Sequence, residues 1–168
     1  MYKHILVPVD GSSTAQQAVR QAVDIASTYG RAVTAIYVID PYPFLGEGAG
    51  LAYGQAEYLT AAKAEAQEAL AAVRAQVEAA GLKADTRMVE AHATWRGIVE
   101  TADAVKADLV VMGSHGRHGL EKLVLGSVTQ RVLQHAKQPV LVVRGEAVAG
   151  GNLARKYASK SVSVTSCP

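Results

Sequence analysis

The residues with the clearest chemical potential form a glycine-rich segment in the last third of the chain. The segment reads Gly113-Ser-His-Gly116-Arg-His-Gly119, and Gly126-Ser127 follow it after an apolar stretch. Glycines let backbone N–H groups approach an anion closely, and the positive end of a helix dipole favours negative charge. Ser127 and Gln130 have capping-box spacing, which predicts a helix that begins at Ser127. The segment therefore predicts a phosphate-binding loop, with the planar guanidinium of Arg117 as a further phosphate contact.

Two widespread phosphate-binding motifs are not present in this sequence. A Walker A loop ends in Gly-Lys-Ser or Gly-Lys-Thr, whereas Leu125 precedes Gly126-Ser127 here. A dinucleotide fingerprint needs Gly-x-Gly-x-x-Gly after the first strand, where this chain has Asp10-Gly11-Ser12-Ser13. The sequence therefore favours neither a P-loop nucleotidase nor a dinucleotide-binding dehydrogenase.

Asp10 follows the first predicted strand and has two interpretations. It is a ligand of a nucleotide or of its Mg²⁺, or it is a turn residue before a helix, where aspartate is favoured in any case. We favour the first, because ligands of open α/β sheets bind beyond the carboxyl ends of the strands. His115 and His118, which flank Gly116, are too few for a metal site of their own. Since no serine or cysteine has a recognisable triad partner, we predict no catalytic residue.

Strands and helices alternate along the chain. Apolar runs predict strands at residues 4–9, 32–39, 83–90, 109–113 and 140–143, and helical periodicity predicts helices at residues 13–29, 59–80, 94–105 and 127–137. Ser13 with Gln16, and Thr94, are candidate helix caps. The Gly- and Pro-rich residues 41–54 predict a loop, either a lid or, as we favour, a plain crossover. The alternation implies a parallel sheet with right-handed crossovers.

Composition limits the class of protein. A chain of 168 residues fits one domain, and no apolar run approaches the ~20 residues of a membrane span. The start of the chain does not resemble a signal peptide, and the single cysteine, Cys167, excludes an intrachain disulfide. We therefore expect a soluble, cytoplasmic protein. The net charge of +2 arises after residue 144, so the main body is neutral and lacks the basic footprint of a nucleic-acid-binding protein.

Three separated segments resemble one family. The spacing Gly113-x2-Gly116-x9-Gly126-Ser127 resembles the nucleotide loop of the ATP-binding branch of the universal stress proteins. The start, from Lys3 to Ser12, resembles that family's first strand, and Pro139 to Val143 resemble its last strand. The resemblance covers residues 2–144. It implies a domain over residues 1–144, and the Gly-, Ser- and Lys-rich residues 145–168 predict a flexible tail.

The resemblance also implies a fold and a ligand. The fold is a five-stranded parallel sheet of order 3-2-1-4-5 with helices on both faces, a Rossmann-type three-layer sandwich like that of the adenine-nucleotide α-hydrolases. The ligand is ATP, with Mg²⁺ near Asp10. The resemblance implies that Asp10 and Val38 contact the adenine and that Pro8 and Gly113 contact the ribose. It implies that Gly116, Gly126 and Ser127 contact the phosphates, and Met112 and Val128 are their neighbours in the sequence.

The function that this resemblance implies is a homo-oligomeric, ATP-dependent sensor or regulator in the stress response, acting on an unknown downstream protein. We do not expect a dedicated enzyme, although weak ATPase activity is compatible with the site. One alternative is a slow ATP-hydrolysing or nucleotidyl-transferring enzyme, and another is a dimer that binds no nucleotide. The apolar strand Pro139 to Val143 predicts the dimer contact, with a tetramer as an extension, because an uncovered edge strand invites pairing; coverage by the tail is the alternative.

Overall fold

The structure is a computed structural model that describes residues 2–29, 32–41, 49–117 and 125–144, with side chains in the second helix from residue 54 onward. The elements in chain order are β1 (His4–Pro8), α1 (Ser13–Tyr29), β2 (Ala32–Ile39), α2 (Ala49–Ala79), β3 (Ala84–Glu90), α3 (Thr94–Ala104), β4 (Leu109–Gly113), α4 (Ser127–His135) and β5 (Val140–Val143). The predicted tail, residues 145–168, lies outside the described residues, and so do residues 42–48 of the predicted loop.

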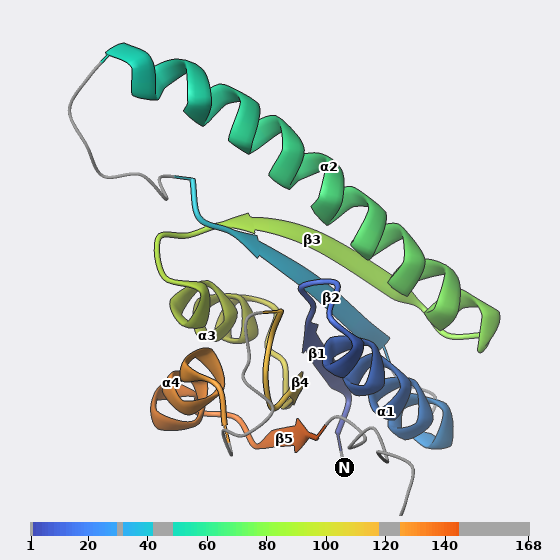
Figure 1. The fold of residues 1–168 in the computed structure, drawn as a ribbon. Helices are drawn as coiled ribbons and strands as arrows, with labels where there is room; N and C mark the ends of the chain where they lie inside the picture. The colour runs from blue at the N-terminus through green and yellow to red at the C-terminus, as the bar shows by residue number, and fades with distance from the viewer. Residues whose placement is uncertain (1, 30–31, 42–48, 118–124, 145–168) are drawn as a thin grey trace, which may run out of the picture.

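The strands of the described chain form one parallel sheet of order β3-β2-β1-β4-β5 (Figure 1). This confirms the predicted five-stranded α/β fold. β1 lies at the centre, where it pairs with β2 on one side and with β4 on the other. Because the strands are parallel, the carboxyl ends of β1, β2 and β4 lie at the same edge of the sheet, and these are the ends that carry the predicted site.

Helices cover both faces of the sheet, and alternate side chains of each strand point to opposite faces. Ile5 and Val7 of β1 pack in one core with α1 and α2, whereas Leu6 packs in a second core with α3 and α4. All three side chains are fully buried. An apolar run without polar alternation is what a strand covered on both faces requires, so the sequence pattern of β1 and β4 follows from their central places.

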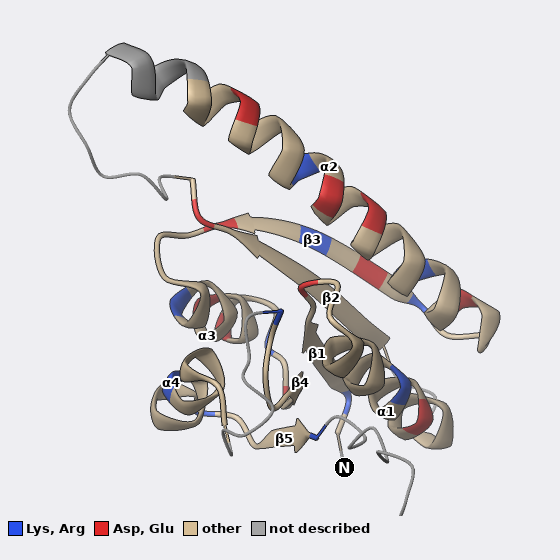
Figure 2. Ribbon diagram, viewed as in Figure 1, with Lys and Arg blue, Asp and Glu red and all other residues tan. Residues whose placement is uncertain are grey.

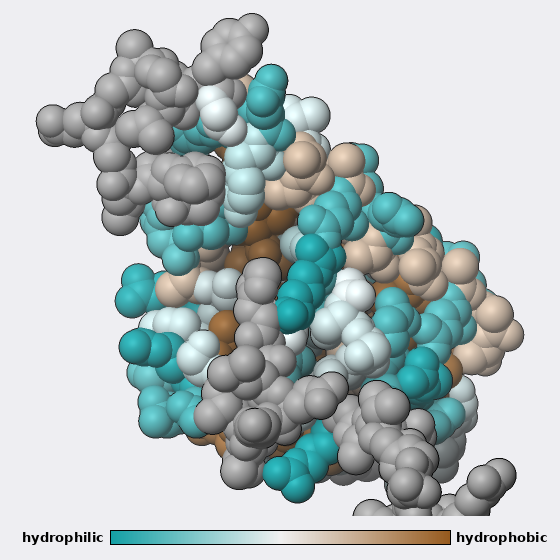
Figure 3. All heavy atoms as spheres, viewed as in Figure 1, coloured by the Kyte–Doolittle hydropathy of each residue, from teal (hydrophilic) through white to brown (hydrophobic). Residues whose placement is uncertain are grey.

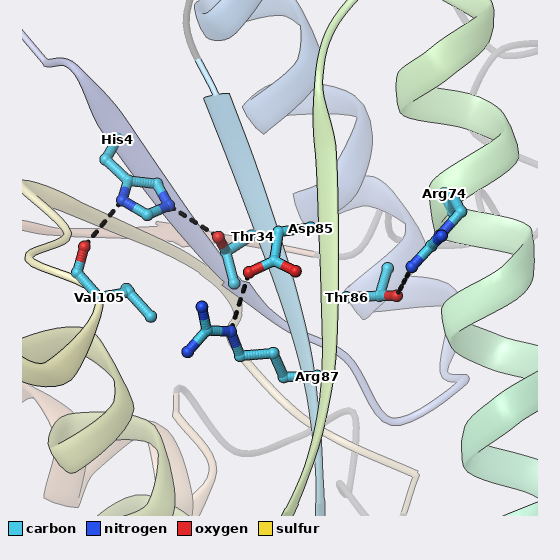
Figure 4. Close-up of polar contacts among 7 residues, drawn as sticks. All are labelled: His4, Thr34, Arg74, Asp85, Thr86, Arg87 and Val105. Carbon is cyan, nitrogen blue, oxygen red and sulfur yellow. Dashed lines mark hydrogen bonds and ion pairs between the residues drawn. The ribbon is translucent and has the colours of Figure 1, made fainter.

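Polar contacts join the amino end of β1 to β2 and to Val105, the residue that follows α3 (Figure 4). Nδ1 of His4 lies 2.9 Å from the carbonyl oxygen of Val105, and Nε2 lies 2.7 Å from Oγ1 of Thr34. Because a carbonyl can only accept, Nδ1–H is the donor and Nε2 accepts from the threonine hydroxyl. Asp108, just before β4, accepts hydrogen bonds from the backbone N–H groups of Lys3 and His4. The start of β1 is thereby joined to the segment between α3 and β4.

The helix starts differ from the sequence expectation. Ser12, not Ser13, caps α1, since its Oγ accepts the N–H of Ala15 at 3.1 Å. The N-caps of α3 and α4 are Ala93 and Gly126, and neither helix has a side-chain cap, so the caps predicted at Thr94 and Ser127 are wrong. Both predicted residues are instead the first residue of their helix.

The second helix begins at residue 49, ten residues earlier than expected. The glycines at 50 and 54 suggested a loop, but each costs a helix only about 1 kcal/mol, and the neighbouring Ala, Leu, Gln and Glu residues favour helix. α2 has 31 residues, a length that could span a membrane, but it carries both acidic and basic residues along its length (Figure 2). None of the described helices is long and apolar enough to cross a membrane.

Candidate functional site

A cavity of about 470 Å³ opens at the carboxyl ends of β1, β2 and β4. Its volume lies within the range of about 300–1,000 Å³ that is typical of small-molecule sites. On the face drawn in Figure 3, hydrophobic atoms appear in a recess between α2 and α3, with hydrophilic residues around it. The structure brings nine of the ten predicted site residues to the cavity wall: Pro8, Asp10, Val38, Met112, Gly113, Gly116, Arg117, Ser127 and Val128. Their contacts with a ligand stay predictions.

Sequence reasoning did not assign several other residues of the cavity wall to the site, namely Val9, Ala15, Ile36, Tyr37, Thr94, Ile98, His115 and Thr129. Most of them are core positions of strands and helices, and nothing in the periodicity distinguishes a core residue that faces a cavity from one that does not. His115 had been considered only as a metal ligand, and its neighbour in that hypothesis, His118, lies outside the described residues.

Asp10 joins the turn after β1 to the loop after β4. Its Oδ1 accepts the backbone N–H of Ser12 at 3.0 Å, and its Oδ2 accepts the backbone N–H of Arg117 at 3.0 Å. Gly11 between them has a φ of +80°, in the left-handed region that favours glycine. The turn interpretation of Asp10 is therefore correct, and the same carboxylate also faces the cavity.

Arg117 lies across this turn. Its Nε donates a hydrogen bond to the carbonyl oxygen of Asp10, and its guanidinium forms an ion pair with Glu65 of α2. A Cβ at Gly11 would lie 2.6 Å from Nη2 of Arg117, so the bare glycine makes room for the guanidinium. Nothing in the sequence connects Glu65 with the site, because helical periodicity marks it only as a surface position of α2.

Two glycines of the loop occupy places where a side chain would overlap with its neighbours. A Cβ at Gly113 would lie 2.9 Å from Cγ2 of Thr14, and a Cβ at Gly116 would lie 2.5 Å from Oδ2 of Asp10. Separations under 3.0 Å are essentially never seen for real Cβ atoms. The close approach of these two residues to Thr14 and Asp10 therefore depends on the glycines.

Gly126, the tenth predicted residue, does not line the cavity. Its backbone N–H donates to the carbonyl oxygen of Ser114 at 2.8 Å, which places the start of α4 against the loop. Ser127 and Val128, in the first turn of α4, do line the cavity. The first N–H groups of a helix have no partner within the helix, so this turn presents backbone donors and the positive end of the α4 dipole.

His115 contributes a buried polar atom that lacks a partner. Its Nδ1 lies 3.1 Å from Oγ of the buried Ser114, whereas its Nε2 is buried without a hydrogen bond among the described residues. If the serine hydroxyl donates to Nδ1, Nε2 carries the proton and is a donor. A buried donor without an acceptor costs about 1–3 kcal/mol.

Tyr37 shows the electrostatic character of the same region. Burial raises the pKa of Tyr37 above its ordinary value, while the guanidinium of Arg117 acts in the opposite direction, and Asp10 and Tyr58 raise it further.

No group of three or more His, Cys, Asp or Glu side chains that could hold a metal occurs among the described residues. The carboxylate of Asp10 suits Mg²⁺, which commonly takes one or two protein carboxylates with phosphate oxygens and water.

Comparisons with known proteins give the family. The sequence model of the universal stress protein family matches residues 1–144. Universal stress protein MJ0531 of Methanocaldococcus jannaschii is 43% identical over 144 residues, which cover 86% of this chain and 83% of that protein. The structure of universal stress protein UspA from Lactobacillus plantarum is similar with a TM-score of 0.77 and 31% identity, covering 85% of this chain and 98% of that chain. A universal stress protein in complex with cAMP is similar with a TM-score of 0.59 and 28% identity, covering 85% and 97% of the two chains. The chain belongs to the universal stress protein family.

Proposed function

We propose that this protein binds ATP with Mg²⁺ in the cavity at the carboxyl edge of the sheet. The observation that carries the proposal is the close approach after β4, where a Cβ at Gly113 or Gly116 would overlap with Thr14 or Asp10. The first turn of α4 lies on the same cavity wall. Exposed backbone N–H groups and a helix N-terminus together are suited to phosphate groups. The cAMP complex of a related protein supports an adenine nucleotide as the ligand class.

The cavity wall includes both kinds of surface that ATP requires. Val38, Ile36 and Ile98, which pack in one apolar cluster, suit the adenine ring, and Gly116 and Ser127 suit the phosphates. Pro8 and Gly113 also line the cavity and are the proposed ribose contacts.

We propose a regulatory role for ATP binding rather than dedicated catalysis. A hydrolase needs a positioned base or a metal site that activates water. Both carboxylate oxygens of Asp10 already accept backbone N–H groups, which suits a fixed structural acceptor better than a proton acceptor. Slow ATP hydrolysis or nucleotidyl transfer is the alternative. In the proposal, a cytoplasmic homo-oligomer changes shape or assembly with ATP, and an unknown downstream protein recognises the change.

The experiment is direct. Nucleotide released from freshly purified protein is identified by mass spectrometry, and calorimetry then compares ATP with Mg²⁺, cAMP and GTP. ATP at 100 times its dissociation constant should stabilise the fold by about 2.7 kcal/mol, with GTP giving less. No heat and no thermal shift with millimolar ATP would contradict the proposal. Accumulation of ADP with a kcat of about 1 s⁻¹ or more, the lower end of ordinary enzymes, would favour the enzymatic alternative.

A further inference from the structure

The arginine that we predicted as a phosphate contact already has an acidic partner. The Arg117 guanidinium forms an ion pair with Oε1 of Glu65, and its Nε donates to the carbonyl oxygen of Asp10. The side chains of Arg117 and Glu65 are 37% and 41% exposed, so both remain accessible to solvent and to a ligand. A phosphate that approaches Arg117 therefore meets an occupied guanidinium.

The formal charges around Arg117 oppose an anion. Asp10 and Glu65 are both acidic and both contact Arg117, which supplies one positive charge to this group of three. The group is therefore net negative while the ion pair is closed. If Arg117 turns from Glu65 to a phosphate, the ligand gains a bidentate cation, but the carboxylate of Glu65 loses its partner.

The backbone of Arg117 allows its side chain to change partner without moving the loop. The backbone N–H of Arg117 is held by Oδ2 of Asp10 at 3.0 Å, independently of the guanidinium. Gly11 has no side chain beneath the guanidinium, where a Cβ would lie 2.6 Å from Nη2. The guanidinium of Arg117 thus lies against the bare backbone of Gly11 at the cavity wall, while the backbone of Arg117 is held by Asp10.

We propose that Glu65 is a built-in competitor of phosphate for Arg117, so that α2 sets how strongly the site prefers phosphorylated ligands. The inference rests on the proposed nucleotide binding and adds its regulation. It assigns a binding role to Glu65, which does not line the cavity. Loss of the Glu65 charge should strengthen binding of ATP and leave adenosine, which has no phosphate, unaffected.

Calorimetry with ATP and with adenosine on the full chain tests this proposal. Exposed ion pairs contribute little, so Glu65→Gln should tighten ATP binding by about two- to fivefold. Glu68→Gln is the matched control, because it removes the same charge from an exposed position three residues further along α2. In an Arg117→Gln background, Glu65→Gln should have no larger effect on ATP than Glu68→Gln.

The outcomes separate the two proposals. Equal ATP affinities in Glu65→Gln and Glu68→Gln, weaker ATP binding in Glu65→Gln, or an equal gain for adenosine would each overturn the competitor role while nucleotide binding stands. Persistence of the Glu65 effect in the Arg117→Gln background would also overturn it. Absence of heat from both ligands with the wild-type chain would overturn the proposed function, and this inference with it.

Discussion

Oγ1 of Thr129 lies 3.0 Å from the carbonyl oxygen of Gly113, to which it donates a hydrogen bond. The same hydroxyl is 3.2 Å from the carbonyl oxygen of Ser114. Thr129 is 2% exposed, so these contacts are protected from water. They connect the first turn of α4 to the end of β4, and the geometry of the cavity therefore depends on a buried hydroxyl.

Thr129→Val should destabilise the protein by about 1–3 kcal/mol, because it keeps the shape of the side chain but removes the hydroxyl donor from the carbonyl oxygen of Gly113. The carbonyl oxygen of Ser114 keeps the N–H of Gly126 as its donor. Urea unfolding monitored by circular dichroism measures the change. Thr129→Ser retains the hydroxyl and should lose less stability than Thr129→Val. Equal stabilities for the valine variant and the wild type would show that the hydrogen bonds contribute nothing net.

Gly116→Ala should weaken ATP binding about tenfold, since the added Cβ would overlap with Asp10 and relieving an overlap of this kind typically costs 1–3 kcal/mol. Isothermal titration calorimetry gives the affinity. Gly54→Ala is the matched control, because a Cβ there has nothing within 4 Å and α2 should gain about 0.5–1 kcal/mol. An unchanged affinity in Gly116→Ala would remove this glycine from the binding loop.

Asp103 provides a pH-dependent contribution to stability. Hydrogen bonds from Lys137 and then Gln138 lower the pKa of Asp103 below its ordinary value of 3.8. A carboxyl group whose pKa is lower in the folded state stabilises the protein above its unfolded pKa, and this contribution is lost as the pH falls through the folded pKa. The difference in unfolding free energy between the wild type and Asp103→Asn should therefore shrink on acidification below pH 3.8.

Lys137→Met tests the cause of that shift. Lys137 is the largest contributor, so its removal should raise the pKa of Asp103 toward the ordinary value, as followed by the carboxyl ¹³C chemical shift. Gln138→Leu should have a smaller effect in the same direction. A larger shift from Gln138→Leu than from Lys137→Met would reverse this order of causes.

The orientation of β5 sharpens the prediction of a dimer. The carbonyl oxygens of Pro139 and Val143 accept the N–H groups of Val110 in β4 and of Ser114 directly after it. Because consecutive residues of a parallel strand alternate between its two sides, Val140 and Val142 direct their N–H and C=O groups away from β4. The side chain of Leu141 is one of the few large apolar groups of the described chain that remains exposed, at 38%.

Val142→Pro should therefore convert a homodimer to a monomer, because it removes an outward N–H donor and leaves the pairing with β4 intact. Light scattering coupled to size-exclusion chromatography measures the mass. Val142→Ala shortens the same side chain but keeps the N–H donor, and it should remain dimeric. A wild-type chain that is monomeric at tens of micromolar, on the order of moderate dissociation constants, would disprove the edge contact.

The strand order and most element positions could be predicted because their signals are local. Three consecutive apolar residues, Ile5, Leu6 and Val7, indicate a strand that is covered by helices on both faces. The glycine spacing indicates the loop after β4. The cap of α1 was misplaced by one residue because Ser12 and Ser13 are both good caps. The choice between them depends on the left-handed turn at Gly11, which sequence spacing does not reveal.

The contacts that shape the site come from residues far apart in the chain. Glu65 and Thr129 look like ordinary helix positions, and their roles arise only when α2 and α4 pack near the ends of the strands. The same holds for Tyr37, whose raised pKa reflects burial within the assembled fold. A single sequence specifies these contacts through the whole fold rather than through any local pattern.

The pairing of β1 with β4 has a consequence for the time at which the cavity forms during synthesis. Asp108 accepts the N–H of His4 across 104 residues, and the cavity wall combines residues that follow each of these two strands. At about 5–20 residues per second, a ribosome needs roughly 5–20 s to add the second set after the first. A nascent chain that ends before β4 lacks half of the cavity wall. A ligand of this cavity can therefore act on the completion of folding, after the late strands have emerged, and not on its beginning.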